Sequence, residues 1–233
     1  MTTDHAVTTR RRAATRARLL LAARDVIAER GAGGATVEGI AERAGFTRGA
    51  FYSNYASLDE LIVDVIREVG ETRLAQVRAA AAQFASHREE DELTIESALE
   101  GGVRDFVHLL QPPMHEVILQ AELRLYALRN EGARAGYVTA VRETMTGVYE
   151  ILETLFASVH AQLRASPEIT MDILMGFFDQ GSVMSYLELG RVDPDEQVSR
   201  LGRLVDVIID RTALPSGGLP EPSRSSVTAD QPN

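Results

Sequence analysis

The chain has 233 residues, of which 45% are hydrophobic, enough to bury a sizeable core. It contains no cysteine, so disulfides, thiolate metal sites and cysteine nucleophiles are excluded. No stretch approaches the roughly 18 consecutive apolar residues of a membrane span, and no apolar segment follows the N-terminal arginines as it does in a secretory signal. We therefore expect a cytoplasmic protein that is neither exported nor embedded in a membrane.

The charge is distributed unevenly along the chain. The formal net charge is −10, but residues 1–60 carry nine arginines against seven acidic residues, whereas the remainder carries 15 against 27. Every basic residue apart from histidine is an arginine, whose planar guanidinium suits phosphate or guanine. A basic end on an acidic body is typical of a nucleic-acid-binding head joined to a second domain.

The pattern along the chain predicts an all-α fold of about nine helices. Apolar residues recur at helical spacing, and no segment shows the strict alternation of a strand. The first helix is expected over about 11–30, with an apolar face formed by Leu19, Leu20, Ala23, Val26 and Ile27. Residues 1–9 are expected to form a disordered arm. Residues 213–233 are expected to form a disordered tail, because proline, glycine and serine leave it little apolar surface.

Capping residues and prolines divide the second part of the chain. Ser57 followed by Glu60 is a capping box, and the pairs Ser166-Pro167 and Asp193-Pro194 each place a capping side chain before a proline at the first helical position. The helices expected here cover about 58–84, 95–110, 113–129, 133–163, 167–190 and 194–212. The last two have apolar faces suited to a symmetric four-helix contact, so we expect a homodimer through them.

Two short helices joined by a tight turn are expected between these parts. Thr36 and Thr47 are placed to cap the two helices, and Gly45 stands where the turn needs a positive φ. The helices are expected at about 37–44 and 48–55. A capped helix N-terminus presents backbone N–H groups and a positive dipole end to a phosphate. The segment therefore predicts a helix-turn-helix whose second helix reads DNA.

The segment is similar to the N-terminal DNA-binding domain of TetR-family transcription regulators, over about residues 15–62. The matches run through a capped helix, an Ala-Gly turn, a small hydroxyl residue and an aromatic-rich stretch: Thr36, Ile40, Ala41, Ala44, Gly45, Thr47, Gly49, Tyr52, Tyr55, Ser57 and Leu61. The resemblance implies a DNA-binding domain at 10–57 and a larger ligand-binding and dimerisation domain at 58–212. Leu58 stands where the family usually has a phosphate-contacting lysine, so that contact is expected to be missing.

The resemblance also implies which residues contact double-stranded operator DNA. Thr36, Thr47 and Tyr52 would contact phosphates, and the second helix would place four residues at or near the major groove: Arg48, Gly49, Ala50 and Asn54. Further charge would come from Arg10, Arg11, Arg12, Arg16 and Arg18. The threonines are equally explained as caps alone, and the N-terminal arginines as a solvated tail. Phe51 and Tyr55 are expected in the core.

The resemblance implies a homodimeric repressor that binds a palindromic operator until a small-molecule inducer enters a pocket among the middle helices. Such a protein is expected in the bacterial cytoplasm, associated with the nucleoid. Candidate pocket residues are Phe106, His108, Leu125, Tyr126, Arg129, Tyr137, Met145, Tyr149, Phe177 and Phe178. Each is also explained as ordinary core. Asp179 and Gln180 are polar groups in an apolar run, for which an internal hydrogen bond is an equal explanation.

Two other classes of protein remain as alternatives. A helical interaction adaptor without a DNA role would suit the acidic body, but it leaves the capped turn unexplained. A helical di-iron carboxylate enzyme needs two Glu-x-x-His pairs, and the sequence offers only Asp105-x-x-His108. We therefore expect no catalytic residues, no metal site and no cofactor.

Overall fold

The computed structural model describes residues 2–90, 101, 104, 105, 107, 108, 110–158 and 162–210. Within them the regular structure is helical apart from one two-residue strand pair. The elements are α1 (Thr2–Arg30), the short 3-10 helix η1 (Ala32–Gly34), α2 (Val37–Arg43), α3 (Arg48–Tyr52), α4 (Leu58–Glu90), α6 (Met114–Arg129), α7 (Glu131–Ser158), β1 (Gln162–Leu163), α8 (Pro167–Leu189), α9 (Pro194–Ile208) and β2 (Ile209–Asp210). The expected all-α architecture is confirmed.

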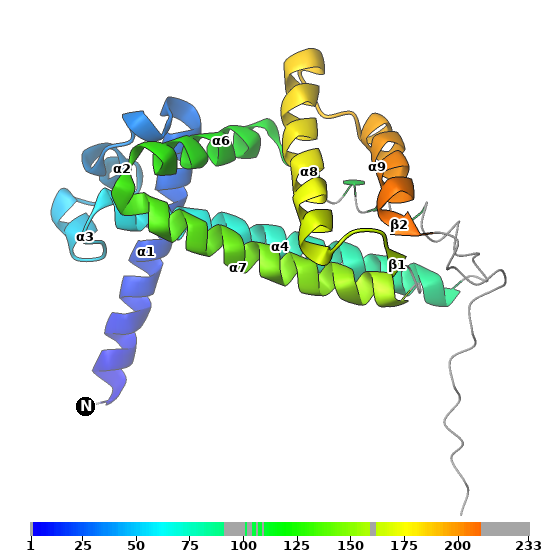
Figure 1. Ribbon diagram of the computed structural model, residues 1–233. Coiled ribbons are helices and arrows are strands. Elements are labelled where there is room, and N and C mark those ends of the chain that lie inside the picture. Colours follow the sequence, from blue (N-terminus) through cyan, green and yellow to red (C-terminus); the bar gives the residue numbers. More distant parts are fainter. Residues whose placement is uncertain are drawn as a thin grey trace, which may run out of the picture.

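The N-terminal helices pack around a closed hydrophobic cluster at one end of the molecule (Figure 1). The helical spacing of apolar residues on α1 predicted this face, and Leu19, Ala23 and Ile27 have no exposed surface. Phe51 of α3 is likewise completely buried, and Tyr55 is 2% exposed. Their expected place in the core is confirmed.

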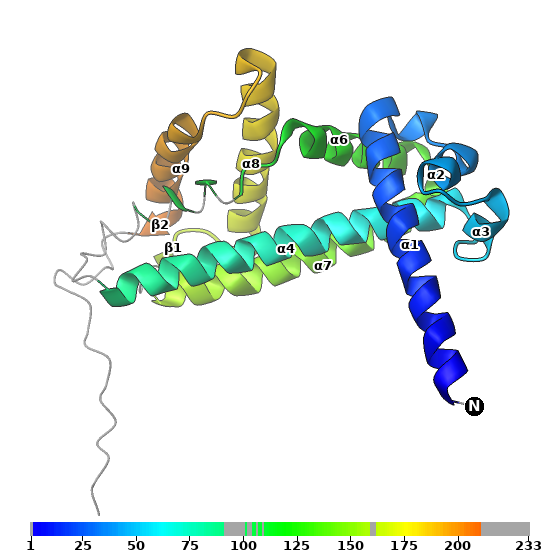
Figure 2. The same cartoon turned by 180° about the vertical axis from the view of Figure 1, so that it is seen from behind.

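Helices α4 and α7 run side by side along the length of the molecule (Figures 1 and 2). Small residues allow this close approach. A Cβ atom on Gly136 of α7 would lie 2.6 Å from a methyl carbon of Val63, and one on Gly70 of α4 would lie 2.2 Å from the Thr144 hydroxyl. Any larger residue at these two positions would force the facing Val63 or Thr144 side chain to shift.

Helices α8 and α9 form a second layer against the distal part of the α4–α7 pair (Figure 1). Both begin where the sequence predicts: Ser166 accepts a hydrogen bond from Ile169 N, and Asp193 accepts hydrogen bonds from Asp195 N and Glu196 N. After α9 the chain pairs in antiparallel fashion with the segment before α8, through β1 and β2. This short pairing ends α9 at Ile208, before the expected end at about 212.

The start of the chain differs from the expectation. Residues 2–9 continue α1 as helix, where the sequence suggested a disordered arm. The physical reason is that α1 contains neither glycine nor proline, so nothing interrupts the helix toward the N-terminus. The predicted tail at 213–233 and most of the predicted helix at 95–110 lie outside the described residues. Among the helices that are described, none has the length and apolar character to cross a membrane.

Candidate nucleic-acid interface and internal pocket

Helices α2 and α3 form a capped helix-turn-helix. Gly39 N donates to the Thr36 hydroxyl at 3.1 Å, and Ala50 N donates to the Thr47 hydroxyl at 3.2 Å. The turn passes through Gly45, whose φ of 72° lies in the left-handed region that glycine adopts without strain. Both predicted caps and the predicted turn are therefore confirmed.

The capping threonines remain exposed, so each hydroxyl can form a further hydrogen bond in addition to the cap. A hydroxyl has one donor and two acceptor positions, and the cap uses an acceptor position of each threonine. The hydroxyl hydrogens of Thr36 and Thr47 stay available at the surface. The two explanations given by the sequence, cap or phosphate contact, are compatible at both positions.

Arg48 and Tyr52 form the exposed face of α3. The Tyr52 side chain is 48% exposed, and the Arg48 guanidinium lies 5.5 Å from the centre of its ring. Arg48 also forms an ion pair with Glu38 of α2 at 2.7 Å, although both side chains are more than half exposed. Its hydrogen bond to Tyr52 and the charge of Glu38 raise the pKa of Arg48, so the guanidinium stays charged.

Asn54 does not lie on this face. Its side chain is 9% exposed, and its amide donates to Ala50 O at 2.8 Å, so it closes the end of α3 instead of reaching outward. Arg16 donates to the Asn54 carbonyl at 2.7 Å, which fixes the same turn from the other side. In this conformation Asn54 is a structural residue, whereas Gly49 is exposed and Ala50 half-buried on the predicted groove side.

The N-terminal arginines divide into two groups. Arg10, Arg11 and Arg12 are exposed on the first half of α1. Arg16 is instead held by Asp64 and lies 4.1 Å from the Tyr55 ring centre. Arg18 donates to Ala44 O at 2.7 Å. The last two arginines thus hold the helix-turn-helix against α1 and α4, so the suggestion that they supply charge to DNA does not fit their contacts.

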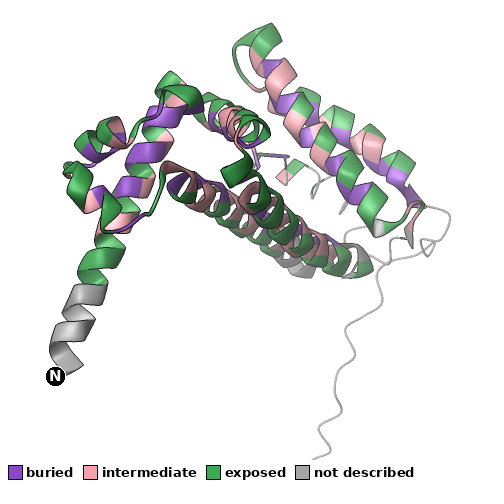
Figure 3. Ribbon diagram, turned by 60° about the vertical axis from the view of Figure 1, so that its left-hand side comes forward, coloured by how far each residue is buried: buried purple, intermediate pink, exposed green. Residues whose placement is uncertain are grey.

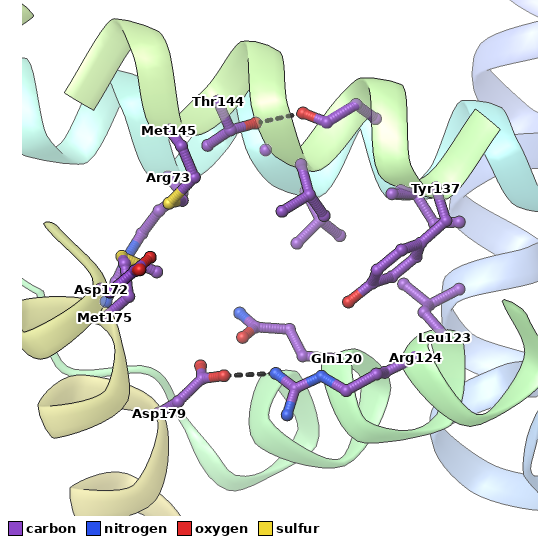
Figure 4. Close-up of a pocket in the computed structure, with 15 residues that line it drawn as sticks. Arg73, Gln120, Leu123, Arg124, Tyr137, Thr144, Met145, Asp172, Met175 and Asp179 are labelled. Carbon is purple, nitrogen blue, oxygen red and sulfur yellow. Dashed lines mark hydrogen bonds and ion pairs between the residues drawn. The ribbon is translucent and has the colours of Figure 1, made fainter. Parts of the chain in front are cut away.

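A cavity of about 370 Å³ lies between α4, α6, α7 and α8 (Figure 4). Two of the candidate pocket residues line it, Tyr137 and Met145, and the Tyr137 ring reaches into the hollow. Asp179, which the sequence marked as unusual, lines it as well. Phe178 lines a small side cavity of about 60 Å³ that also borders Asp179.

The other candidate residues lie elsewhere. Tyr126 packs against the N-terminal cluster and donates to Asp59 at 2.7 Å, while Tyr149 and Phe177 pack against the distal cluster. His108, Leu125 and Arg129 are exposed outside the cavity lining, and Phe106 lies outside the described residues. Aromatic character therefore failed to separate core positions from cavity positions.

The polar residues of the cavity were mostly missed by sequence reasoning. They are Arg73, Gln120, Arg124, Thr144 and Asp172. One signal was available, because Arg73 recurs at helical spacing with the apolar Ile66 and Val69 and so lies on the inward face of α4. The contribution of α6 depends on how that helix crosses α4 and α7, which no local pattern encodes.

Two arginines of the cavity have different environments. Arg124 forms an ion pair with Asp179 across the rim, drawn as a dashed line in Figure 4, and hydrogen bonds to Tyr137 and Asp179 raise its pKa. Arg73 NH1 donates to Leu110 O at 2.8 Å. Burial lowers the pKa of Arg73, opposed by the nearby charges of Asp179 and Glu116. Among the described residues, no carboxylate forms an ion pair with Arg73.

Helix α6 connects the cavity with the N-terminal domain. Glu122 of α6 accepts a hydrogen bond from Ala32 N at 2.9 Å, directly after α1. Glu116 lies 3.3 Å from Arg24 of α1. In the part of the chain that is described, no three histidine or acidic side chains come together as a metal site would require.

Comparison with known proteins agrees with this geometry. Residues 19–65 match the bacterial regulatory proteins of the tetR family. The fold is similar to that of a Mesorhizobium loti protein described as a TetR-family transcriptional regulator, with a TM-score of 0.65 and 13% identity over 86% of this chain and 99% of that one. A search of the curated proteins finds no match.

Two further solved structures share the fold. The multidrug binding protein EbrR, solved with imidazole, has a TM-score of 0.57 and 25% identity over 87% of this chain and 92% of its own. SmeT, the repressor of the Stenotrophomonas maltophilia multidrug efflux pump SmeDEF, has a TM-score of 0.53 and 20% identity, over 89% of this chain and 96% of its own. The helix-turn-helix thus matches the tetR family of bacterial regulatory proteins, and the chain as a whole shares the all-helical fold of a solved TetR-family protein.

Proposed function

We propose that the chain is a homodimeric repressor that binds a palindromic operator through α3 and is released when a small molecule fills the internal cavity. The observation that carries the proposal is the exposed, capped α3, which presents Thr47, Arg48 and Tyr52 on one surface. A dimer reads two half-sites about 34–36 Å apart on one face of DNA. The protein would act in the cytoplasm, bound to the nucleoid.

On this surface each residue has a separate role. The hydroxyls of Thr36, Thr47 and Tyr52 would donate to phosphates and so position α3, while Arg48 would reach a base edge after leaving Glu38. Gly49 and Ala50 keep α3 slim where it approaches the groove. Arg10, Arg11 and Arg12 would add phosphate contacts from the projecting part of α1.

The dimer would form through α8 and α9. Ile169, Ile173 and Leu187 lie on one face of α8 by helical spacing, and their exposed fractions are 54%, 38% and 76%. Val207 of α9 is 66% exposed as well. Figure 3 shows exposed residues along both helices. Apolar surface of this kind marks an interface, and a second copy of the same helices completes a four-helix contact.

Release would pass through α6. One side of this helix lines the cavity with Gln120, Leu123 and Arg124, and another side holds the N-terminal domain through Glu122 and Tyr126. A ligand that displaces α6 therefore shifts the two DNA-binding domains between spacings that fit or do not fit the operator. EbrR is solved with ethidium and with imidazole, and SmeT is a repressor, which supports ligand-controlled repression here.

The proposal is tested by fluorescence anisotropy with a labelled duplex from the DNA upstream of the chain's own gene, at two salt concentrations and with unrelated DNA as competitor. Specific binding by a dimer that weakens as salt rises is the expected result, because phosphate contacts release counterions. If that duplex does not bind, selection from random DNA follows. Failure to select any sequence would contradict the proposal and favour a protein-interaction adaptor.

Single substitutions test which residues of α3 contact DNA. Tyr52→Ala and Arg48→Gln should each weaken operator binding by on the order of tenfold, without changing the dimer measured by analytical ultracentrifugation. Arg142→Gln is the matched control, since Arg142 is an exposed arginine of α7 away from α3. Equal losses in all three variants would indicate a general charge effect and would remove the assignment of α3 as the reading helix.

A further inference from the structure

The charged residues of the cavity, more than its apolar walls, indicate which class of ligand it binds. Its apolar walls are formed largely by aliphatic and methionine side chains: Ile66, Val69, Leu123, Val141, Met145 and Met175. Such walls bind apolar groups of almost any shape. The few charged groups among them therefore decide which ligands are accepted.

Three of the four charged residues at the cavity are already balanced or screened. Arg124 and Asp179 neutralise each other in an ion pair that spans α6 and α8. Asp172 is exposed at the rim, where water screens its charge. The remaining charge is the guanidinium of Arg73, on which the charges of Asp179 and Glu116 act without forming an ion pair.

Arg73 is held inside the cavity without a carboxylate partner among the described residues. Its single hydrogen bond in that part of the chain goes from NH1 to Leu110 O, which leaves most of its five N–H donors unused. The side chain extends from α4 toward α8, where it lies 5.8 Å from the Phe178 ring centre. It keeps some exposed surface because it faces the hollow, yet enough protein surrounds it that burial lowers its pKa.

A desolvated arginine in this position is costly unless an anion pairs with it. We propose that the effector is a compact amphipathic carboxylic acid, whose carboxylate binds Arg73 and whose apolar body lies along α4 and α7 toward Tyr137. This inference rests on the proposed function, since it names the chemical class of ligand for the same cavity.

The geometry restricts the acid further. The planar guanidinium fork matches the two oxygens of a carboxylate, and a single guanidinium that forms no ion pair with the described residues matches a monoanion better than a phosphate dianion. Arg73 and Ile66 are seven residues apart on α4, so the lined length of the cavity is about 10 Å. A phenylalkyl or medium-chain alkyl acid fills that length, whereas a flat cation of the ethidium kind would meet the charge of Arg73 unscreened.

The first experiment compares ligands that differ only in charge. Isothermal titration calorimetry of the full chain, without DNA, would use 4-phenylbutyrate, 4-phenylbutanol and 4-phenylbutylammonium, together with a series of alkyl acids from hexanoate to dodecanoate. At least one acid should bind on the order of tenfold to a hundredfold more tightly than its alcohol, and its ammonium analogue should bind most weakly. Equal or tighter binding of the alcohol or ammonium, or no binding of any acid, would overturn the proposal.

Variants then locate the carboxylate. Arg73→Gln keeps a donor for Leu110 O but removes the charge, and it should abolish the preference for the acid over the alcohol. Arg78→Gln, at an exposed position of the same helix, is the matched control and should leave the preference unchanged. Asp179→Asn leaves Arg124 unpaired and should tighten acid binding. Unchanged discrimination in Arg73→Gln, with its fold verified by circular dichroism, would overturn the assignment of Arg73.

These outcomes separate the two proposals. Acid binding that depends on Arg73 in a chain that binds no DNA would preserve the ligand class and contradict the repressor function. Specific DNA binding that no acid relieves, combined with the absence of acid binding by calorimetry, would preserve the DNA function and contradict the ligand class.

Discussion

The N-terminal and distal hydrophobic clusters are closed to different degrees. Leu19, Ile40 and Phe51 of the N-terminal cluster have no exposed surface. In the distal cluster Leu174 and Phe178 each remain 8% exposed, and the neighbouring faces of α8 and α9 carry bare apolar residues. Both clusters border the cavity, through residues such as Ile66 and Met145, but only the second lies beside an apolar surface suited to a second copy.

The polar groups of the two regions also differ, because those around α3 face solvent and those around the cavity face inward. Around α3 they face solvent, as at Tyr52 and Arg48, and can meet a polyanion that is itself hydrated. Around the cavity they face inward, as at Arg73, where a single charge is strong because little water screens it. Many weak exposed contacts suit a long DNA backbone, and one strong internal contact suits a small ligand.

The largest expected effect, a loss of folding stability, tests whether the N-terminal cluster is fully buried. Phe51→Ala should lower the free energy of unfolding by about 3–5 kcal/mol, because the ring is fully buried and leaves a cavity. The adjacent Tyr52→Ala should change it by less than about 0.5 kcal/mol, since Tyr52 is exposed. Urea unfolding at one fixed protein concentration measures both. Similar losses from the two neighbours would contradict the orientation of α3.

Alkaline pH probes the same cluster. Burial raises the pKa of Tyr55 to about 12, from an ordinary value near 10. The unfolded chain therefore loses this proton first, so the contribution of Tyr55 to stability is constant below about pH 10 and falls by roughly 2–3 kcal/mol as pH rises to about 12. Burial raises the pKa of Tyr126 as well, which adds a loss of the same sign. Urea unfolding against pH should show a smaller decline in Tyr55→Phe, and an identical decline would refute the prediction.

A glycine pair tests the long α4–α7 contact of the body. Gly136→Ala should destabilise the fold by about 1–2 kcal/mol, because overpacking against the stiff Val63 outweighs the better helix propensity of alanine. Gly49→Ala in α3 is the matched control, because a Cβ there meets nothing closer than 3.8 Å. Thermal unfolding should show a lower Tm for the first variant alone. If Gly136→Ala stabilises the chain, α4 and α7 are not in close contact there.

The smallest expected effect concerns the surface of the helix-turn-helix. Glu38→Gln frees Arg48 and removes a negative charge next to the incoming phosphates, so operator affinity should rise about two- to fivefold at low salt. Glu143→Gln, at an exposed position of α7, controls for the change in net charge. Anisotropy titrations compare the two. A gain shared equally by both variants would show that net charge, and not the Glu38–Arg48 pair, sets the affinity.

Local signals predicted much of the fold. Capping side chains at Thr36, Thr47, Ser166 and Asp193 marked helix starts, because a cap involves only residues within one turn. Gly45 marked the tight turn for a similar reason. Most residues predicted to contact DNA lie on the exposed side of the helix-turn-helix or of α1, but Asn54, Arg16 and Arg18 are held in contacts within the chain that local patterns do not encode.

The cavity was much less predictable. Its walls come from four helices, and residues such as Gln120 and Asp172 meet only through tertiary packing. Several aromatic candidates, among them Tyr126 and Tyr149, pack against the two hydrophobic clusters instead. The continuation of α1 to Thr2 was not predicted, although residues 2–30 contain neither glycine nor proline.

The double engagement of α6 has a consequence for genetics. Substitutions on its cavity side, as at Gln120 or Arg124, should yield proteins that still occupy the operator but no longer answer the effector. Substitutions on its other side, as at Glu122, should uncouple the two domains. Calorimetry would then still detect effector binding, but the bound effector would not relieve repression. Both classes of variant would be non-inducible in a genetic screen. Only an effector-binding assay would distinguish variants that no longer bind the effector from variants that bind it without releasing DNA.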